Sequence, residues 1–422
     1  MVLGYLLARA GVQTVVLEKH KDFLRDFRGD TVHPSTLEVM AELGLLDEFL
    51  KLPHQQVRQL QGQIGESRVT VADFAHIPTR CKFIALMPQW HFLNFLAERA
   101  EQLPAFRLIT EAEVTDVIWE NGRVVGVKAK TFEIRASLVV GADGRHSTVR
   151  ARAGLQVEDL GSAIDVLWMR LSRRPEDSAE SLAYFNYGRV FVTLDRGDYW
   201  QCAFVIRKGE LDDLRAKGIE GLRAQIVRIT PMFGNRVQEL ESWDDIKLLT
   251  VRVDRLREWW RPGLLCIGDA AHAMSPLGGV GINLAVQDAV AAANLLAEPL
   301  RRGVYTGDDL NAVQCRRMFP TRFTQGLQVL AQERFIGAVL ASGVSLRPPW
   351  QVQLFNRMKW LQRIPARVVG VGVRPEHVRT EPVALETRHT TRRGQAGGAV
   401  TNGAANEHAA SSDVWVRRTS SE

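Results

Sequence analysis

A glycine-rich run at positions 268–283 carries the residues best suited to binding chemistry. An apolar segment ends at Gly268, Asp269 lies where the backbone turns, and Gly278, Gly279 and Gly281 follow. Because glycine has no Cβ, the backbone at these positions can approach a flat ligand closely. A helix beginning at Gly281 would present its free amides and the positive end of its dipole to that ligand. The run therefore predicts a site for a flat ligand that carries negative charge.

Charged side chains elsewhere have the types expected around a dinucleotide. Glu18 ends a short apolar run, where an acid in dinucleotide-binding folds accepts hydrogen bonds from ribose hydroxyls. Asp143 and Gly144 follow another apolar run, and a carboxylate at such a turn can hold the loop or meet a ribose. Arg28 lies beside a glycine, where it can meet a phosphate. Each of these residues alone also fits an ordinary solvated position, so only their combination with the glycine-rich run indicates a ligand.

The elements that would position these residues are typical of a parallel α/β sheet. The N-terminal pattern predicts a helix over 3–10 and a buried strand over 13–17, and a second helix is expected over 35–50. The dipeptide Asn121-Gly122 lies between two alternating runs and predicts a β-hairpin. Helices that alternate with apolar strands must cover both faces of the sheet.

Changes of pattern divide the chain into segments. Longer alternating strands replace the first pattern near position 154, and the parallel-strand signature returns near 254. Beyond 382 the chain has few large apolar residues, which predicts a disordered tail. We therefore expect a ligand-binding domain in two parts, 1–153 and 254–382, a sheet domain over 154–253, and a tail over 383–422.

Composition excludes several classes of protein. The 422 residues are 45% hydrophobic and 24% charged, which is typical of a globular chain with two or three units. No apolar stretch reaches the roughly 18 residues of a membrane span, and the start lacks the basic region of a signal peptide, which favours the cytoplasm. The net charge of +6 is dispersed among acids, so nucleic acid is not an expected partner. The four cysteines lie far apart and indicate no metal site.

In combination, these motifs resemble those of the FAD-dependent aromatic hydroxylases, the class A flavoprotein monooxygenases similar to para-hydroxybenzoate hydroxylase and the ubiquinone-pathway hydroxylases. The resemblance covers about residues 1–377. It implies a mixed α/β fold, with a Rossmann-like FAD-binding domain, an inserted antiparallel-sheet substrate domain and C-terminal helices. The residues that the resemblance assigns to FAD are Glu18, Lys19, Arg28, Gln89, Asp143, Gly144, Gly268, Asp269, Pro276, Gly279, Gly281, Ile282 and Asn283.

The resemblance also implies an activity. NADPH or NADH would reduce FAD, O2 would add at flavin C4a, and the resulting hydroperoxide would hydroxylate an aromatic, polyketide or quinone-like substrate. The enzyme would act as a monomer or homodimer. Two alternatives to a hydroxylase stay open: a related FAD-dependent reductase, and a degenerate, non-catalytic protein that binds FAD poorly. The residues expected to line the substrate pocket are Trp168, Arg170, Trp200, Gln201 and Pro276.

The chain departs from the family pattern at its start. The family opens with a strand and a GxGxxG turn before the first helix, and neither is present here. Gly4 matches the glycine that follows this fingerprint, where the helix packs closely. We hypothesise that Met1 is a wrongly chosen or truncated start, which an in-frame apolar strand and glycine turn in the upstream DNA would support.

Overall fold

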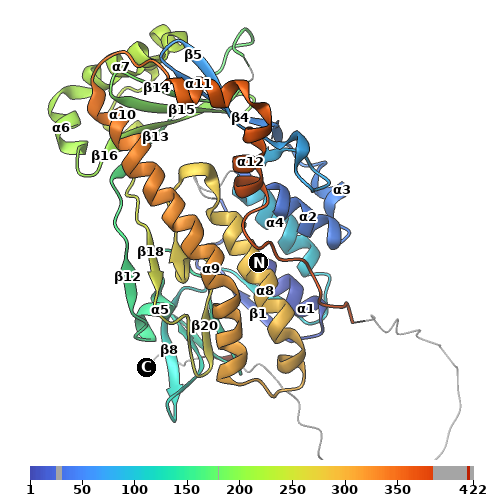
Figure 1. The fold of residues 1–422 in the computed structure, drawn as a ribbon. Coiled ribbons are helices and arrows are strands. Elements are labelled where there is room, and N and C mark those ends of the chain that lie inside the picture. The colour runs from blue at the N-terminus through green and yellow to red at the C-terminus, as the bar shows by residue number, and fades with distance from the viewer. Residues whose placement is uncertain (25–30, 179, 384–415, 419–422) are drawn as a thin grey trace, which may run out of the picture.

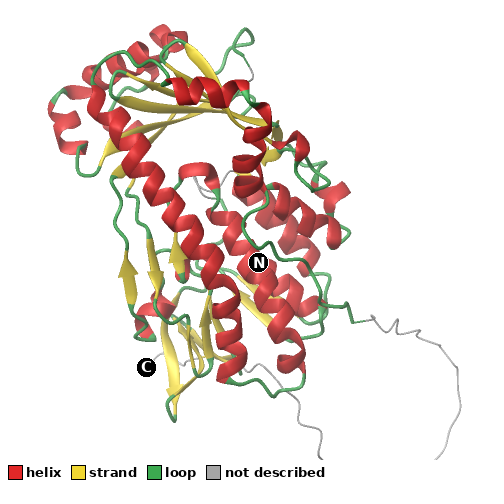
Figure 2. Cartoon of the chain, in the orientation of Figure 1, coloured by secondary structure: helices red, strands yellow, loops and turns green. Residues whose placement is uncertain are grey.

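The computed structural model describes residues 1–24, 31–178, 180–383 and 416–418. Strands gather at the two ends of the molecule, and long helices run between them (Figures 1 and 2). The fold is mixed α/β, as the sequence predicts. Arg28 lies outside the described residues.

One end is a single seven-stranded sheet of order β17-β13-β16-β15-β14-β4-β5. Two of its strands, β4 and β5, precede position 154, and β4 joins the sheet through a parallel pairing with β14. The expected sheet domain over 154–253 therefore omits two strands, because such a long-range pairing leaves no local pattern. The strands are β4 (Gln59–Ile64), β5 (Ser67–Asp73), β13 (Ile164–Ser172), β14 (Leu182–Asn186), β15 (Arg189–Asp195), β16 (Tyr199–Arg207) and β17 (Lys247–Leu249).

The remaining strands form short sheets. Parallel pairs join β1 to β7 and β11 to β20, and the hairpin predicted at Asn121-Gly122 joins β8 to β9. The strands of these sheets are β1 (Thr14–Leu17), β2 (Thr31–Val32), β3 (Gln55–Val57), β6 (Ile84–Leu86), β7 (Phe106–Ile109), β8 (Val114–Glu120), β9 (Arg123–Ala129), β10 (Phe132–Arg135), β11 (Val139–Gly141), β12 (Val157–Asp159), β18 (Asp254–Leu256), β19 (Trp260–Arg261), β20 (Leu264–Cys266), β21 (His272–Ala273) and β22 (Val416–Arg418).

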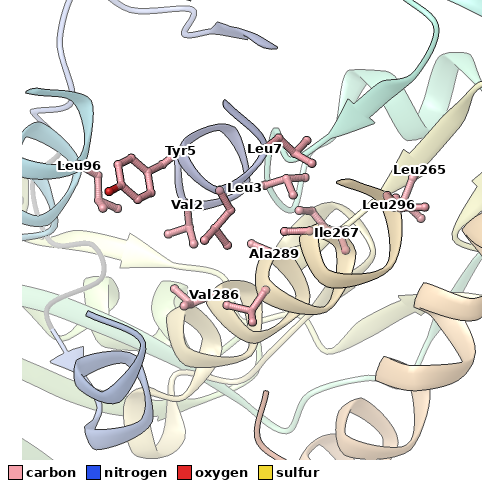
Figure 3. Packing of buried hydrophobic residues seen from close by; sticks show 14 of the residues in the cluster. Val2, Leu3, Tyr5, Leu7, Leu96, Leu265, Ile267, Val286, Ala289 and Leu296 are labelled. Atoms are coloured by element: carbon pink, nitrogen blue, oxygen red, sulfur yellow. The ribbon is translucent and has the colours of Figure 1, made fainter. Parts of the chain in front are cut away.

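Helices α1, α4 and α8 build the core that faces these short sheets. Leu3 and Tyr5 of α1 lie beside Leu96 of α4 and Ala289 of α8 (Figure 3). A Cβ on Gly4 would lie 2.6 Å from Cγ2 of Val16, so only glycine lets α1 approach β1 this closely. This confirms the close packing predicted for Gly4.

The remaining helices include one break that the sequence pattern missed. The helix expected over 35–50 is two helices, because Gly44 adopts a φ of +73° between them. The helices are α1 (Val2–Arg9), α2 (Pro34–Glu42), α3 (Leu46–Phe49), α4 (Gln89–Ala100), α5 (Thr148–Arg152), α6 (Leu211–Ala216), α7 (Gly218–Ile229), α8 (Gly281–Arg301), α9 (Gly307–Ala331), α10 (Gly337–Ser342), α11 (Trp350–Arg357) and α12 (Arg363–Gly370). Short 3-10 helices are η1 (Phe74–His76), η2 (Pro231–Glu239), η3 (Trp243–Asp245), η4 (Gly268–Ala270), η5 (Leu277–Gly279) and η7 (Lys359–Gln362), and η6 (Gln332–Ile336) is a π-helix.

Little of the expected tail over 383–422 is described. Val383 bonds through its backbone N–H to the carbonyl of Arg9, and Val416–Arg418 pairs antiparallel with β10. This short strand is a difference from the fully disordered tail that the composition predicts.

Candidate functional site

The turn at Gly268 is anchored by a buried ionic cluster. The Asp288 carboxylate of α8 accepts hydrogen bonds from the Gly268 N–H at 3.0 Å, from His272 Nε2 at 2.5 Å and from Arg317 Nε at 2.8 Å. All three side chains in the cluster are almost fully buried. Burial raises the pKa of Asp288, but His272 and Arg317 outweigh that effect and hold the pKa below its ordinary value. The carboxylate thus fixes the end of β20 against α8 and α9.

The Gly278–Gly279 loop is held by residues far away in the chain. Thr31 Oγ1 donates to the Gly279 carbonyl at 2.8 Å, and His33 Nε2 lies 3.1 Å from the Gly278 carbonyl. Both glycines have positive φ, and a Cβ on Gly279 would lie 2.6 Å from Thr31 Oγ1. Glycine is therefore required for this loop to lie against β2.

His33 is an uncharged donor in this arrangement. Its side chain is fully buried, and burial lowers its pKa to about 4 against the opposing effect of its backbone hydrogen bonds. The neutral ring donates through Nε2, because the Gly278 carbonyl can only accept.

Asp269, Arg145 and the start of α8 come together at one surface. Arg145 lies 3.6 Å from the Asp269 carboxylate, and both side chains are partly exposed. A Cβ on Gly281 would lie 3.9 Å from Asp269 Oδ1, so the acid is next to the first turn of α8. Gly144, with a φ of +86°, has open space where a Cβ would stand. The surface therefore offers a carboxylate, a guanidinium and free helix amides to a ligand.

Asp143 has a structural contact of its own. Its Oδ2 accepts the backbone N–H of Val149 at 3.1 Å, and Ser147 caps the same helix by accepting from the N–H of Arg150. This is the loop-holding role that the sequence left open beside ribose binding. Ser147 is the N-cap of α5.

Glu18 lies near the N-terminus of α1. Its Oε1 accepts the backbone N–H of His20 at 3.0 Å, and its charge raises the pKa of the Met1 amine, which burial lowers more strongly. Lys19 is exposed beside it, and Gln89 is half-buried at the start of α4. Glu18 is thus close enough to the start of α1 to act on the Met1 amine.

Two residues of the glycine-rich run face inward. Asn283 is buried, and its Oδ1 accepts hydrogen bonds from Ser35 at 2.7 Å and Thr36 at 3.0 Å. The side-chain carbonyl of Asn283 therefore joins α8 to α2. Ile282 packs against the main core, whereas Pro276 is half-buried in the loop before α8.

The sheet candidates lie on opposite faces. Trp168 packs on the face that meets η6 and α10, and Gln201 belongs to the same face, where its Oε1 accepts from Arg196. Arg170 is exposed, and its guanidinium lies 4.6 Å from the centre of the Tyr199 ring. Trp200 instead is buried in the other face beneath α7.

The structure does not bring Trp200 to the candidate site. Its indole Nε1 donates to Asp177 at 2.9 Å, and its ring packs edge-on against Phe233. Alternation along a strand sends neighbouring side chains to opposite faces, so Trp200 and Gln201 cannot both face one pocket.

Two glutamines of α9 were not found from the sequence. Gln328 accepts the N–H of Ser275 and donates to the carbonyls of Ser275 and Leu277 at 3.0 and 2.9 Å. Gln325 donates to the carbonyls of Asp254 and Ala273. The only available signal was their spacing of three residues, which places both on one face of a helix.

Comparisons with known proteins identify the family. Residues 1–312 match the family described as an FAD binding domain. The 6-methylpretetramide 4-monooxygenase of Streptomyces rimosus is 31% identical over 357 residues, which cover 82% of this chain and 84% of that protein. The chain belongs to the class A FAD-dependent aromatic hydroxylases. This confirms the family that the motifs of the sequence indicate, and FAD as its cofactor.

Other monooxygenases match over shorter or more divergent regions. The rifampicin monooxygenase of Streptomyces venezuelae is 29% identical over 68% of this chain, which spans 60% of that protein. The solved structure of p-nitrophenol 4-monooxygenase PnpA from Pseudomonas putida superposes with a TM-score of 0.67 and 21% identity, covering 86% of this chain and 93% of that one. The similarity to this solved structure shows that the two proteins share a fold.

Two further features concern metal ions and membranes in the described residues. They contain no group of three or more His, Cys, Asp or Glu side chains able to hold a metal ion. One helix over 277–301 is long and apolar enough to cross a membrane, and 72% of its apolar window is buried inside the protein.

The described residues fit FAD. Gly144 has a positive φ and leaves open space where a side chain would otherwise stand, and Asp269 lies beside the free amides of α8. This arrangement suits a flat ring system with polar, negatively charged edges next to a hydroxyl-bearing chain.

Proposed function

We propose that the chain hydroxylates an aromatic ring of a phenolic or polyketide-type substrate, using FAD, NADH or NADPH, and O2. The single observation that carries this proposal is the meeting of Asp269, Arg145 and the first turn of α8 at one partly exposed surface. We place the activity in the cytoplasm, where the nicotinamide reductant is available, with the enzyme as a monomer or homodimer.

Each part of the site has a distinct task toward FAD. Asp269 would accept hydrogen bonds from the hydroxyls of the ribityl chain, and Glu18 from those of the adenosine ribose. The first amides of α8 would stabilise negative charge on the ring system. When bound, FAD supplies the electron transfer and oxygen activation that no protein side chain provides.

The loop 275–281 needs to be rigid for this task. Thr31 and His33 bond its backbone from β2 and the residue after it, and Gln328 bonds it from α9. Fixed amides do not reorganise as charge develops, which is the source of electrostatic stabilisation in active sites.

We propose that the sheet face that carries Trp168 and Gln201 lines the substrate pocket. The indole Nε1 of Trp168 is buried and has no hydrogen-bond partner among the described residues. A buried donor without a partner is costly, so a substrate oxygen that accepts this bond would be stabilised. The π-helix η6, a form that is frequent at functional sites, meets this face through Ile336.

The decisive experiment is a coupled measurement of FAD binding and turnover. We expect the purified chain to show the visible bands of bound oxidised flavin after addition of FAD. NADH and NADPH oxidation should then accelerate with 6-methylpretetramide or p-nitrophenol, substrates in the names of two relatives. Isotope-labelled O2 should place one labelled oxygen atom in the product. A chain that binds FAD but never incorporates oxygen with phenolic substrates would overturn the proposal.

Replacement of Asp269 tests the flavin site directly. We expect Asp269→Ala to weaken FAD binding by about tenfold, because hydrogen bonds to a charged group contribute roughly 1.5–3 kcal/mol. Fluorescence quenching of FAD during titration measures this affinity. Asp308→Ala is the matched control, because Asp308 also lies in the first turn of a helix, away from the glycine-rich run. Equal FAD affinity in both variants would contradict the assignment.

Replacement of Trp168 tests the proposed substrate pocket. Trp168→Phe keeps an aromatic ring but removes the N–H, so we expect kcat/KM to fall about fivefold to tenfold while FAD affinity stays unchanged. Trp243→Phe is the control, because Trp243 packs against the core on the opposite face of the sheet. An unchanged kcat/KM in Trp168→Phe would remove this residue from the pocket.

A further inference from the structure

The C-terminal helices carry an unusual charge pattern. Residues 334–375 contain no Asp or Glu and seven Arg or Lys. All seven are exposed, and none of them forms an ion pair with an acidic side chain of the described residues. Five of the seven lie between positions 347 and 367, on or next to α11, η7 and α12. They are Arg347, Arg357, Lys359, Arg363 and Arg367.

Large apolar side chains are exposed in the same segment. Trp350 is 69% exposed and Leu354 47% exposed on α11, one helical turn apart. Trp360 on η7 is 57% exposed, and Ile364 on α12 is 58% exposed. We call these four residues together with the five cations the C-terminal patch.

The patch is held rigidly on the edge of the seven-stranded sheet. Helices α11 and α12 and the short η7 all contact the edge strand β5. The Asn356 side chain accepts the N–H of Thr70 at 3.0 Å and donates to the carbonyl of Arg68 at 3.2 Å. These bonds cover the free edge of β5, as protected sheet edges require. The inner side of α11 is thereby fixed, and its outer side is left to solvent (Figure 1).

We propose that the C-terminal patch binds the surface of an anionic lipid membrane. Exposed Trp and Leu side chains bury themselves at the boundary of headgroups and acyl chains, and Arg and Lys are drawn to anionic headgroups. A surface of this kind supplies the negative charge that the patch lacks. The protein then lies on the membrane without crossing it.

Charge argues against a second copy of the chain as the occupant. A twofold interface would place the same patch on both sides, so the unpaired cations of each copy would face those of the other. Like charges across an interface oppose association, whereas an anionic surface attracts all five.

Vesicle sedimentation tests the proposal with the full chain. We expect binding to vesicles of equal parts phosphatidylcholine and phosphatidylglycerol at low salt, loss of binding at high salt, and little binding to phosphatidylcholine alone. Tryptophan emission should shift to the blue on binding, because Trp350 and Trp360 leave water. Absence of binding to the anionic vesicles, or equal binding to both kinds, would overturn the proposal.

Paired variants distinguish an effect of the C-terminal patch from an effect of the protein's overall charge. Arg357→Glu with Lys359→Glu should lower partitioning at least tenfold, because each basic residue near an anionic surface is worth about fivefold. Arg252→Glu with Arg257→Glu makes the same charge change at exposed positions elsewhere and should have a much smaller effect.

A second pair of variants tests the exposed apolar side chains of the C-terminal patch. Trp350→Ser with Trp360→Ser should also lower partitioning about tenfold, while Phe319→Ser with Phe323→Ser on α9 should not. Circular dichroism establishes that each variant is folded, and sedimentation equilibrium gives its mass. A tryptophan variant that converts a dimer to a monomer without changing vesicle binding would assign the patch to a second copy and overturn the proposal.

Discussion

At the residue scale, His33 couples the flavin loop to pH. Its folded pKa of about 4 lies below the ordinary value of 6.5, so the unfolded chain binds a proton more readily than the folded one. The stability due to neutral His33 is present above about pH 6.5 and is lost as the pH falls toward 4. The expected loss is about 1.4 kcal/mol per pH unit within that window.

Urea unfolding at a series of pH values checks this prediction. We expect His33→Gln to flatten the pH dependence between pH 6.5 and 4, because its amide can still donate to the Gly278 carbonyl but does not titrate. His146→Gln, at an exposed histidine, should keep the slope of the unchanged protein. A slope in His33→Gln equal to that of the unchanged protein would contradict the assignment.

Residue types predicted the local backbone better than the direction of each side chain. Gly279 adopts the positive φ that the glycine-rich run predicts, and Asp269 lies at the turn after β20. Trp200 and Asn283 were expected at the ligand, yet both side chains are bonded within the protein core. The face on which a strand residue lies depends on register, which strand composition does not determine.

At the scale of elements, the Asp288 carboxylate joins α8, α9 and the turn at Gly268. We expect Asp288→Ala to lower the free energy of unfolding by about 3–5 kcal/mol, because it leaves His272 buried without its partner and leaves Arg317 with Glu376 alone. Urea unfolding monitored by circular dichroism measures the change.

A second variant separates lost charge pairing from lost packing. Asp288→Leu combined with Arg317→Met should cost less than Asp288→Ala alone, because the guanidinium is removed together with its carboxylate, while Glu376 keeps its pair with Arg316. Arg301→Ala breaks an exposed pair with Glu298 and should cost under about 1 kcal/mol. A double variant less stable than Asp288→Ala would show that the cluster is not dominated by charge pairing.

Sequence patterns predicted helix starts and hairpins well where a few neighbouring residues determine them. The hairpin at Asn121-Gly122 and the start of α8 at Gly281 appear as expected. The break at Gly44 was missed because an isolated glycine is compatible with a continuing helix as well as with a helix end.

At the scale of the whole molecule, the sequence indicated the family but not the pairing of distant strands. Strands β4 and β5 join the large sheet across more than a hundred residues of chain, through the parallel contact of Ala183 with Gly62. Loop closure over such a distance is determined by the packed fold and leaves no trace in local periodicity.

One continuous helical path links the flavin loop to the large sheet. It runs through α9, η6 and α10, from Gln328 at the Ser275 backbone to Ile336 and Leu340 in the core of the sheet face (Figure 1). A rigid helix that is packed at both ends makes separate unfolding of the two ends unfavourable. We therefore expect the chain to unfold in one transition.

FAD binding should consequently stabilise the sheet as well as the loop. At a free FAD concentration about 100 times Kd, linkage adds about 2.7 kcal/mol to the free energy of unfolding. Hydrogen exchange of amides in β13 and β16 that open only by global unfolding should then slow about a hundredfold. Asp269→Ala at the same FAD concentration should slow them less, because its affinity is lower. Slower exchange confined to the loop 275–281, with β13 and β16 unchanged, would show that the two ends unfold independently.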